Sequence, residues 1–445
     1  MKYYVNKQII TPEEPVMQCG FAARTHKSEG IHDDLYASLL LLQDDKETTV
    51  ALIALDLLYG DRSFSDGIRK ALKEQCGIDQ VILNYAHTHA AVSVTGDDLS
   101  KRESLTDGFP WSADKSETEY QADLSYFHRI RKTILDLAEE GLNHLQEGNL
   151  YLCRSQSCFG VSRRYPTDGT VAWRPYFNRS AIDPDLFLLK IENKKGELAG
   201  LVYQYACHPT TLGSDNYLIS ADFPGVVRRL LEENHQGITA LFLQGCGADI
   251  KPLATADGDR FKSCSYEELE KAGLSLAREI ETSLSLGSWR KLDLDLAMDR
   301  SEVRLFTEYF SKAEWLALLY DPNEPDYVKD AILRYSTDPE RRGRYLPFEL
   351  TSLRLDQKTA LVALENEVVS EIGKKMKRLF SQDVMVLGYS NSCFCYIPSK
   401  QVLLEGGYEA DSFKRTHLTG PFTPETEDIL VGRAASMIWE ALHMR

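Results

Sequence analysis

The 445-residue sequence predicts an α/β fold with a large mixed β-sheet core flanked by α-helices. Three observations predict this fold class. Short runs rich in Val, Ile and Leu recur along the chain, as expected for strands that are buried on both faces. Turns that contain Gly, Pro, His or Asn end these runs. Segments with the helical spacing of apolar residues follow several of the runs, which is the alternation typical of layered α/β domains.

The predicted elements follow from these patterns in chain order. The apolar runs that we interpret as strands with their end turns lie within residues 48–61, 80–90, 200–213, 238–252, 359–366 and 383–398. Helical spacing predicts helices over 64–75, 265–286 and 367–380. Because the chain contains no internal repeat, low-complexity segment or Gly/Ser linker, we expect a single domain spanning residues 1–445.

Two stretches depart from this regular pattern. Residues 96–122 show no periodicity and are long for a loop, which predicts either a lid or a mobile excursion of the chain. Residues 305–345 are acidic, aromatic and helical in spacing, so we expect a helical insertion there.

Charge and composition exclude several functional classes. The formal net charge of −16 argues against nucleic acid or an anionic membrane surface as a partner, because both attract basic patches. The sequence has no apolar run long enough to insert into a membrane and no export signal at its start, so we expect a cytoplasmic protein. The odd count of nine cysteines, without a CxxC pair, predicts free thiols. The sequence does not indicate an oligomeric state.

Side chains that can bind a metal follow four of the predicted strands. They are His87 with His89, His208, Glu367 and Tyr396. If residues 81–89 are extended, the two neighbouring histidines point to the same side of the chain. In open α/β sheets, ligands bind beyond the carboxyl ends of the strands, so we expect these side chains to gather in one place.

Each of these residues also has an ordinary structural interpretation. One histidine of the HTH pair can be a satisfied buried group and the other exposed, and the His-Pro pair at His208 can be a simple turn. Glu367 falls where we expect a helix to begin, and an acid in a first turn suits the helix dipole. Tyrosine is common in strands, which is the alternative for Tyr396. The combination of two histidines and a glutamate, however, is a ligand set suited to Zn²⁺ with one position left for water.

Seven short motifs occur in an order that resembles a known family. They are GIHDDLYA (30–37), HTHA (87–90), CHPTT (207–211), ISADFPG (219–225), FLQGCGADIKP (242–252), LENEVVSEIG (364–373) and GYSNSCFCYIPSKQVLLEGGYE (388–409). Their sequence is similar to the N-terminal catalytic domain of the neutral/alkaline non-lysosomal ceramidases, over nearly the whole chain. The resemblance implies the catalytic-domain fold of that family and zinc-dependent hydrolysis of an amide bond.

The resemblance also implies roles for individual residues. The implied Zn²⁺ ligands are His87, His208, Glu367 and Tyr396. The implied catalytic groups, which would contact substrate or the developing charge, are His89, Tyr408 and Arg163, with Arg164 as the neighbouring choice. The family has Pro-Gly before its glutamate, whereas this chain has Glu365-Asn366.

One further departure concerns the substrate. The glycine-rich loop carries a serine in the family but Lys251 here, and a lysine cannot replace a serine hydroxyl. We expect Lys251 and Asp249 to line the pocket, with the lysine suited to an anionic or a sugar-like substrate. The chain also ends before the C-terminal immunoglobulin-like domain of the family, and with no export signal it is not expected to meet a membrane lipid.

These observations lead to one functional hypothesis and two alternatives. The hypothesis is a zinc-dependent hydrolase that cleaves an amide (N-acyl) or related acyl bond in a small, soluble, polar substrate through a metal-activated water. We expect Asp222 or Asp56 to orient the ligating histidines. The alternatives are an inactive, metal-braced protein that binds a small ligand, and a true ceramidase that works without the loop serine.

Overall fold

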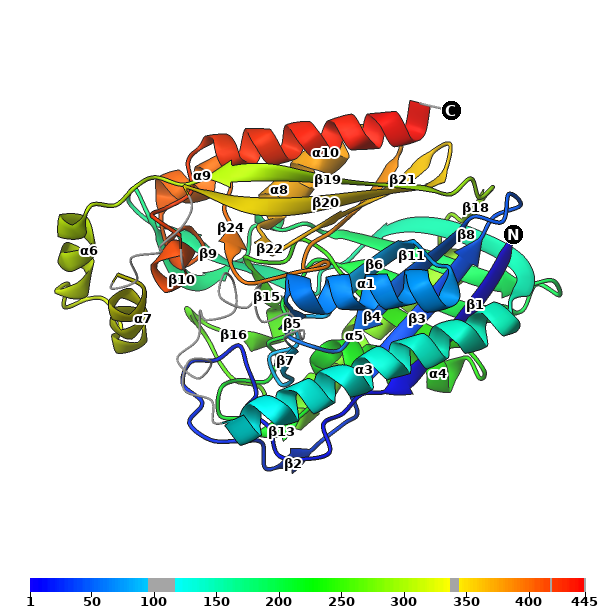
Figure 1. Ribbon diagram of the computed structural model, residues 1–445, viewed down its shortest axis with the longest axis horizontal. Helices are drawn as coiled ribbons and strands as arrows, with labels where there is room; N and C mark the ends of the chain where they lie inside the picture. The colour runs from blue at the N-terminus through cyan, green and yellow to red at the C-terminus, as the bar shows by residue number, and fades with distance from the viewer. Residues whose placement is uncertain (95–116, 337–343, 417, 444–445) are drawn as a thin grey trace.

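The computed structural model describes residues 1–94, 117–336, 344–416 and 418–443. Within these residues two sheets form the centre of the molecule (Figure 1). The larger has nine strands, in the order β14 (Thr239–Gln244), β12 (Leu198–Tyr205), β11 (Asp185–Asn193), β8 (Gln146–Gln156), β1 (Lys2–Ile9), β3 (Tyr36–Gln43), β4 (Thr49–Leu55) and β6 (Gln80–Tyr85), with β18 (Arg290–Leu292) paired to β8. The smaller has the order β19 (Ala297–Phe306), β20 (Tyr345–Asp356), β21 (Thr359–Leu364) and β23 (Asp383–Leu387).

Three pairs of parallel strands stand out among antiparallel neighbours. The pairs are β4 with β6, β12 with β14, and β21 with β23. Each pair is connected by a helix, respectively α1 (Arg62–Cys76), α4 (Asp222–Asn234) and α8 (Ser370–Arg378). These are βαβ units, in which the carboxyl ends of both strands lie at the same edge of the sheet.

Asn84, in strand β6, brings the ends of the three units together. Its side-chain amide donates to the carbonyl oxygens of Gln244 at 3.3 Å and Gly388 at 2.8 Å, and its Oδ1 accepts from the Gln244 backbone N–H at 2.7 Å. Gln244 ends β14, and Gly388 directly follows β23. Because a buried amide left without partners is costly, these bonds hold the three strand ends next to one another. The loops that follow them therefore gather in one region.

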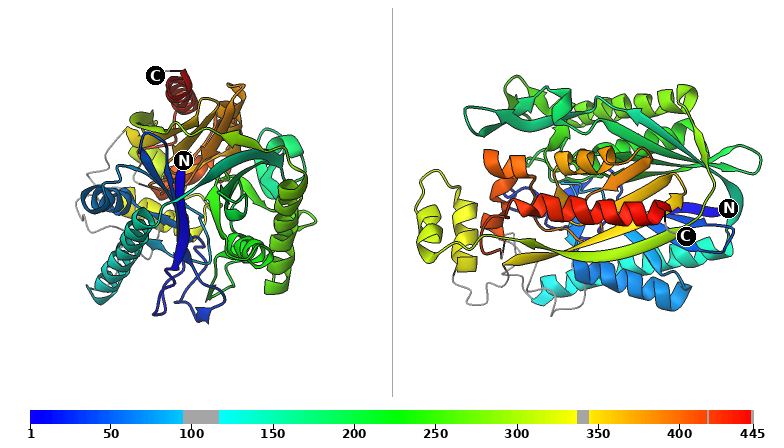
Figure 2. Two further views of the ribbon diagram at one scale, coloured as in Figure 1. Left: turned by 90° about the vertical axis from the view of Figure 1, so that its right-hand side faces the viewer. Right: turned by 90° about the horizontal axis from the view of Figure 1, so that it is seen from above.

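One core layer lies between the two sheets, and further core layers lie between the sheets and the helices outside. Along β4, Leu52 and Ala54 face the layer between the sheets, whereas Ile53 and Leu55 face the helices. Helices α1 and α3 (Glu117–Asn143) cover the β3–β4–β6 side, and α4 and α5 (Tyr266–Leu286) cover the β11–β12–β14 side. Helices α8 and α10 (Glu425–His443) cover the smaller sheet (Figures 1 and 2).

Short elements surround the gathered loops. The strand pairs are β9 (Gly160–Pro166) with β10 (Val171–Tyr176) and β15 (Ile250–Pro252), β22 (Glu367–Val368) with β24 (Tyr396–Ile397), β5 (Tyr59–Gly60) with β7 (Ser93–Val94), β2 (Gly30–Ile31) with β13 (Leu218–Ile219), and β16 (Ala256–Asp257) with β17 (Arg260–Phe261). The short helices are α9 (Lys400–Glu405), η1 (Arg179–Ala181), η2 (Leu253–Thr255) and η3 (Ala410–Arg415). Over the described ranges, no helix combines the length and apolar character needed to cross a bilayer.

The predicted fold class is confirmed, and so are the six strands read from apolar runs, which are β4, β6, β12, β14, β21 and β23. The helices expected over 64–75 and 265–286 are α1 and α5. The prediction of a helix from residue 367 is wrong at its start, because α8 begins at Ser370. Most antiparallel strands went unpredicted, among them β1, β8 and β19, whose faces are partly exposed and less uniformly apolar.

The two irregular stretches have different outcomes. Between β19 and β20 the chain forms α6 (Lys312–Leu319) and α7 (Asp326–Ser336), although both ends of the expected insertion, Leu305 and Tyr345, are strand residues. Of the expected lid or excursion over 96–122, residues up to 116 lie outside the described residues, and the remainder is the first turns of α3.

Candidate metal centre

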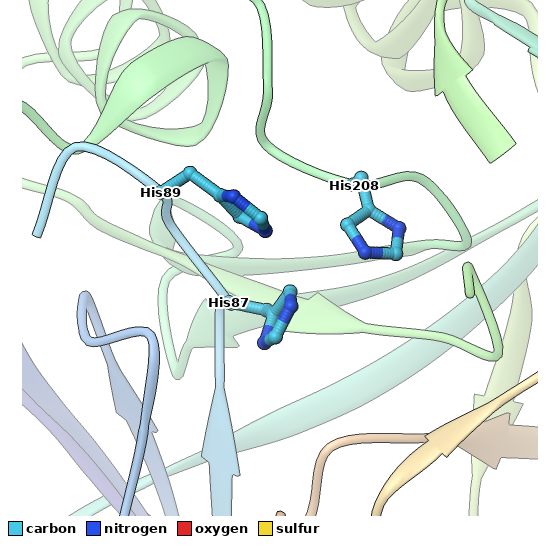
Figure 3. Close-up of side chains that lie close together, drawn as sticks. All are labelled: His87, His89 and His208. Carbon is cyan, nitrogen blue, oxygen red and sulfur yellow. The ribbon is translucent and has the colours of Figure 1, made fainter. Parts of the chain in front are cut away.

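His87 follows strand β6 and turns its imidazole toward the other histidines (Figure 3). The strand ends at Tyr85, and His87 has a φ of 62°, so the expected extended conformation through His89 is wrong. A turn, held by the His87 backbone N–H donating to Leu57 O at 3.0 Å, places the ring instead. Its Nδ1 lies 3.0 Å from Leu58 O, which leaves Nε2 facing the site.

His208 reaches the same space from the end of β12 and is fully buried. Its Nδ1 lies 2.7 Å from the carbonyl oxygen of Gly247, in the loop after β14. The side chain of Gln244 fixes the preceding residue, because it accepts from Cys207 N at 3.2 Å and donates to Cys207 O at 2.7 Å. One βαβ unit thus supplies both this histidine and the loop that orients it.

Glu367 connects the two histidines. Its Oε2 lies 3.2 Å from His87 Nε2 and 3.0 Å from His208 Nε2. Glu367 is in β22, where it stands in parallel register with Tyr396 of β24. The Tyr396 hydroxyl lies 3.4 Å from His208 Nε2. Four side chains from three distant stretches of the sequence therefore converge, although Glu367 is a strand residue and not the first residue of a helix.

The hydrogen-bond directions at this cluster favour a cation. A carbonyl oxygen only accepts, so the Nδ1 of His87 and of His208 must carry the proton, and in a neutral ring Nε2 is then a lone pair. Burial, the largest cause, lowers the pKa of His208 to about 4, so this ring is neutral at pH 7. A nitrogen lone pair thus faces an ionised carboxylate oxygen, an arrangement that a positive ion between them would stabilise.

His89 completes the cluster from the other side of the HTH turn. Its ring centre lies 5.0 Å from that of His87 and 5.6 Å from that of His208. The ring is 8 % exposed, and neither nitrogen has a hydrogen-bond partner among the residues that the structure describes. Burial and the other two histidines lower the pKa of His89 well below its ordinary value. The potential ligand atoms of the three histidines lie within 4.8 Å of one another.

Arg163, on β9, lies beside the two tyrosines of the site. Its guanidinium carbon is 5.4 Å from the ring centre of Tyr396 and 5.3 Å from that of Tyr408. Its Nε donates to Glu409 Oε1 at 2.7 Å, while Arg164 Nη1 donates to the other oxygen at 2.6 Å. Burial lowers the pKa of Arg163, but Tyr396 and Glu409 outweigh burial and raise it, so the group stays charged. Arg163, and not Arg164, lines the cavity.

A cavity of about 360 Å³ adjoins the cluster and is lined by His87, His89, Arg163, Glu367 and Tyr396. Aromatic side chains form much of its wall, including Phe21, Trp173, Tyr327, Phe394 and Tyr408. Lys251 enters from β15 and donates from Nζ to Thr210 Oγ1 at 2.9 Å. The cavity therefore offers both apolar surface and positive charge next to the candidate metal ligands.

Comparison with known proteins identifies the family. Residues 7–252, more than half of the chain, match the family described as neutral/alkaline non-lysosomal ceramidase, N-terminal. The chain belongs to this family. Its fold is similar to that of the neutral ceramidase from Pseudomonas aeruginosa, with a TM-score of 0.72 and 17 % identity over 99 % of this chain and 74 % of the other. The fold is also similar to that of a structure titled ceramidase complexed with C2. There the TM-score is 0.71 and the sequence identity 16 %, over 100 % of this chain and 75 % of the other. A search of curated proteins gives no match.

In this ceramidase-family chain, backbone carbonyls and not carboxylates orient the two histidines. The expectation that Asp56 or Asp222 does so is wrong, because both are engaged elsewhere. Asp56 forms an ion pair with Arg228 at 2.7 Å. Asp222 accepts from the backbone N–H groups of Leu212 at 3.0 Å and Phe223 at 2.6 Å. Carbonyl groups are present at every residue, so the sequence carries no signal for which of them performs this role.

Asp249 also departs from expectation. It does not line the cavity, because its carboxylate is turned toward the start of α8. There Oδ1 accepts from the Ser370 backbone N–H at 2.7 Å and Oδ2 from the Ser370 hydroxyl at 3.0 Å. Asp249 thereby ties the glycine-rich loop to the helix that follows Glu367. The prediction that Lys251 lines the cavity agrees with the structure.

Several residues of the site were missed from the sequence. Tyr389 is fully buried, and its hydroxyl lies 3.5 Å from His208 Nδ1. The Cys393 sulfur lies within 4.8 Å of the potential ligand atoms of His87 and Glu367. Both residues belong to the quoted GYSNSCFCYIP motif, which could have indicated them. Gly20 went unnoticed as well. Its φ is 95°, and a Cβ there would lie 2.4 Å from His89 Nδ1, so only glycine leaves room for that ring.

Proposed function

We propose that this chain is a zinc-dependent hydrolase that cleaves an amide (N-acyl) or related acyl bond in a small, soluble, polar substrate. The observation that carries the proposal is the position of Glu367 Oε2, 3.2 Å from His87 Nε2 and 3.0 Å from His208 Nε2, with both Nδ1 atoms facing carbonyl oxygens. Membership of the ceramidase family supports amide hydrolysis as the reaction class.

The donor set fits Zn²⁺. Two neutral imidazoles and a carboxylate are ligands that zinc commonly takes in catalytic sites, and the phenol of Tyr396 is a further oxygen donor. His87, His208, Glu367 and Tyr396 would hold the ion. When bound, zinc acidifies a coordinated water and polarises a carbonyl group.

His89 has two ring nitrogens that are available to hydrogen-bond a substrate. Its two nitrogens lack partners within the described part of the chain, and its ring faces the candidate ligands. Burial and the neighbouring histidines keep this ring neutral, so it has one N–H and one lone pair. The N–H is placed to donate to the developing oxyanion, and the lone pair can accept a proton before it passes to the leaving amine.

Arg163 and Tyr408 support the same reaction. Arg163 Nη2 has no hydrogen-bond partner among the described residues, although the side chain is 3 % exposed. A permanently charged donor in so dry a place stabilises negative charge that develops on the substrate. Tyr408 is exposed at the cavity wall, where its hydroxyl can reach a substrate more easily than that of the buried Tyr396.

Metal analysis tests the ligand assignment. Protein purified without added metal is expected to carry one zinc ion per chain, and His87→Ala or His208→Ala is expected to lose it with all hydrolytic activity. The matched control is His144→Ala, because the His144 side chain is exposed and its one hydrogen bond within the described residues is to Glu140 O. Full zinc occupancy in either site variant would remove that histidine from the ligand set.

Turnover separates the hydrolase from the metal-braced binding protein. A panel of N-acyl and O-acyl compounds, half with polar and half with apolar acyl groups, is expected to contain substrates for the zinc-loaded wild type. Loss of turnover in Glu367→Gln would show that the wild-type activity arises at this site. If zinc is bound and no compound in the panel is cleaved, the inactive binding protein is the better explanation.

Ceramide itself is a second candidate substrate. The aromatic wall formed by Trp173, Tyr327 and Phe394 favours it, because these side chains can pack against an acyl chain. Activity on a short-chain ceramide equal to that on the best soluble substrate would support this candidate. A rate indistinguishable from that of Glu367→Gln would exclude it.

A further inference from the structure

Lys251 is a buried cation without an acidic partner. Its side chain is 8 % exposed, and its one hydrogen bond within the described residues is to the Thr210 hydroxyl. Burial, with a smaller effect of Arg163, lowers the pKa of Lys251 to about 8, so the ammonium is still largely charged at pH 7. Holding an unpaired charge in a buried position is costly, and proteins retain such a group where something else supplies the countercharge.

The positive charge of Arg163, which lines the same cavity as Lys251, is only partly compensated. It shares the single carboxylate of Glu409 with Arg164, so two guanidinium groups divide one negative charge. Glu405 adds a second contact, but to Arg164 alone. The Nη2 group of Arg163 remains without a hydrogen-bond partner among the described residues. Strands β9 and β15 are paired, with Lys251 opposite Val161, so the two cations stand on adjacent strands.

The other charged groups around the cavity do not neutralise the positive charges of Lys251 and Arg163. Glu367 is engaged by the two histidines, and Asp249 and Asp222 are turned toward Ser370 and toward backbone N–H groups. Arg415 adds another positive charge to the cavity wall, where its guanidinium lies 4.1 Å from the Tyr408 ring centre. Within the described residues, the cavity is therefore lined by three cations and one acid, and that acid belongs to the candidate metal ligands.

We propose that Lys251 and Arg163 form a subsite for an anionic group, a carboxylate or a phosphate, on the substrate. This subsite rests on the proposed function, because it lies in the same cavity as the candidate metal ligands and fixes the substrate beside them. The aromatic wall then receives the acyl part, while Lys251 donates to the anion and the positive charge of Arg163 attracts it, which leaves Nη2 of Arg163 to the reacting carbonyl group. An N-acyl amino acid, or its phosphonate counterpart, has this combination of groups.

Equilibrium binding of ligands that cannot be hydrolysed tests the subsite separately from catalysis. The probes are a ketone analogue of N-hexanoylglycine with a methylene in place of the amide N–H, its neutral primary amide, and its phosphonate counterpart. Calorimetric titration of the zinc-loaded wild type is expected to give Kd values at least about tenfold lower for one or both anions than for the amide, since bonds between charged groups are worth that much.

Variants assign the preference to Lys251. Lys251→Met is expected to reduce the anion preference to less than about threefold, whereas Lys251→Arg keeps it because the charge remains. The control is Lys262→Met, an exposed lysine paired with Glu268, which is expected to leave all three Kd values unchanged. Circular dichroism and zinc content verify folding, and Lys251→Gln replaces Lys251→Met if that variant is unfolded.

The outcomes distinguish the subsite from the hydrolase proposal. Equal binding of the amide and both anions by the wild type would overturn the subsite, as would an unchanged preference in Lys251→Met. An anion preference that depends on Lys251 supports it even where N-hexanoylglycine is not cleaved, and that failure would count against the hydrolase alone. Cleavage of neutral N-acyl compounds without an anion preference would overturn the subsite and leave the hydrolase standing.

Discussion

Two buried polar clusters in this protein differ in how completely their groups are satisfied. In the first, Lys377 of α8 donates to both oxygens of Asp183 and to Asp185, which also accepts from Arg154 at 2.9 Å. In the second, at the carboxyl ends of the βαβ units, His89 and Arg163 have ring or guanidinium nitrogens without partners in the described residues.

The comparison distinguishes polar groups that stabilise the fold from polar groups that are available to a ligand. A buried ion pair with every hydrogen bond made holds elements together, and here it ties α8 to the start of β11. Unused donors and acceptors at equal burial stabilise nothing in the free protein, so we expect them to act on a ligand, a metal or a transition state. Substitutions in the two clusters should therefore affect different properties.

The largest effect is expected for Glu367→Gln. Loss of the shared carboxylate should remove zinc and lower kcat/KM by about a thousandfold or more, because several kcal/mol of transition-state stabilisation depend on the metal. The metal-free protein should unfold at the same urea concentration as the metal-free wild type, since the new amide can donate to a histidine lone pair. Zinc content, steady-state kinetics and urea unfolding measure these effects. A large loss of stability with zinc retained would make Glu367 part of a structural cluster.

Lys377→Met should show the opposite pattern. It leaves the carboxylates of Asp183 and Asp185 buried without their cation, and breaking such a pair costs about 3–5 kcal/mol of unfolding free energy. Zinc content and kcat/KM of the folded fraction should stay at wild-type values. Urea unfolding of the zinc-free proteins provides the measurement, with Arg378→Met, an exposed position at the end of the same helix, as the control. Zinc loss in folded Lys377→Met would contradict the separation of the two clusters.

His89→Leu is expected to reduce activity without reducing stability. Removing one preorganised donor from a catalytic site typically lowers kcat by about a hundredfold or more. Because both ring nitrogens lack partners in the free protein, an apolar replacement should leave the unfolding free energy within about 1 kcal/mol of the wild type. Zinc should be retained. A variant with wild-type kcat would exclude His89 from the reaction.

The smallest effect is a pH dependence of stability in the metal-free protein. The folded-state pKa of His208 is lowered to about 4 by burial, against an ordinary 6.5, so the unfolded chain binds a proton at higher pH than the folded chain. Between these values unfolding takes up a proton, and the unfolding free energy should rise with pH, by about 3 kcal/mol. Urea unfolding at several pH values, compared with His208→Gln, measures this slope. The same slope in the variant would assign it to other groups.

The fold could be read from the sequence where burial is uniform. Strands β4, β14 and β21 are apolar on both faces, and their sequences carry that pattern directly. Antiparallel strands such as β1 and β19 mix exposed and buried positions without clean alternation, so their pairing depends on distant partners. The meeting of the three strand ends depends on Asn84, and nothing in its local sequence indicates partners at residues 244 and 388.

The residues of the candidate site could be predicted from the sequence for a related reason. His87, His208 and Glu367 stand just after buried strands, and strand ends of βαβ units meet, so their side chains could be expected to gather; their role as zinc ligands stays a prediction. The groups that orient the two histidines could not be predicted from the sequence, because backbone carbonyls have no sequence signature. Asp56 and Asp222, which were expected in this role, bind other partners. The left-handed turn at His87 was equally hidden, since that conformation is uncommon for a histidine.

The most direct test of this account is a crystal structure of protein purified without added metal, with diffraction measured on both sides of the zinc absorption edge. We predict one anomalous peak, about 2.0–2.2 Å from His87 Nε2, His208 Nε2 and a Glu367 oxygen. Density at that position without a zinc signal, or a zinc peak bound elsewhere while these three side chains bond only to one another, would contradict it.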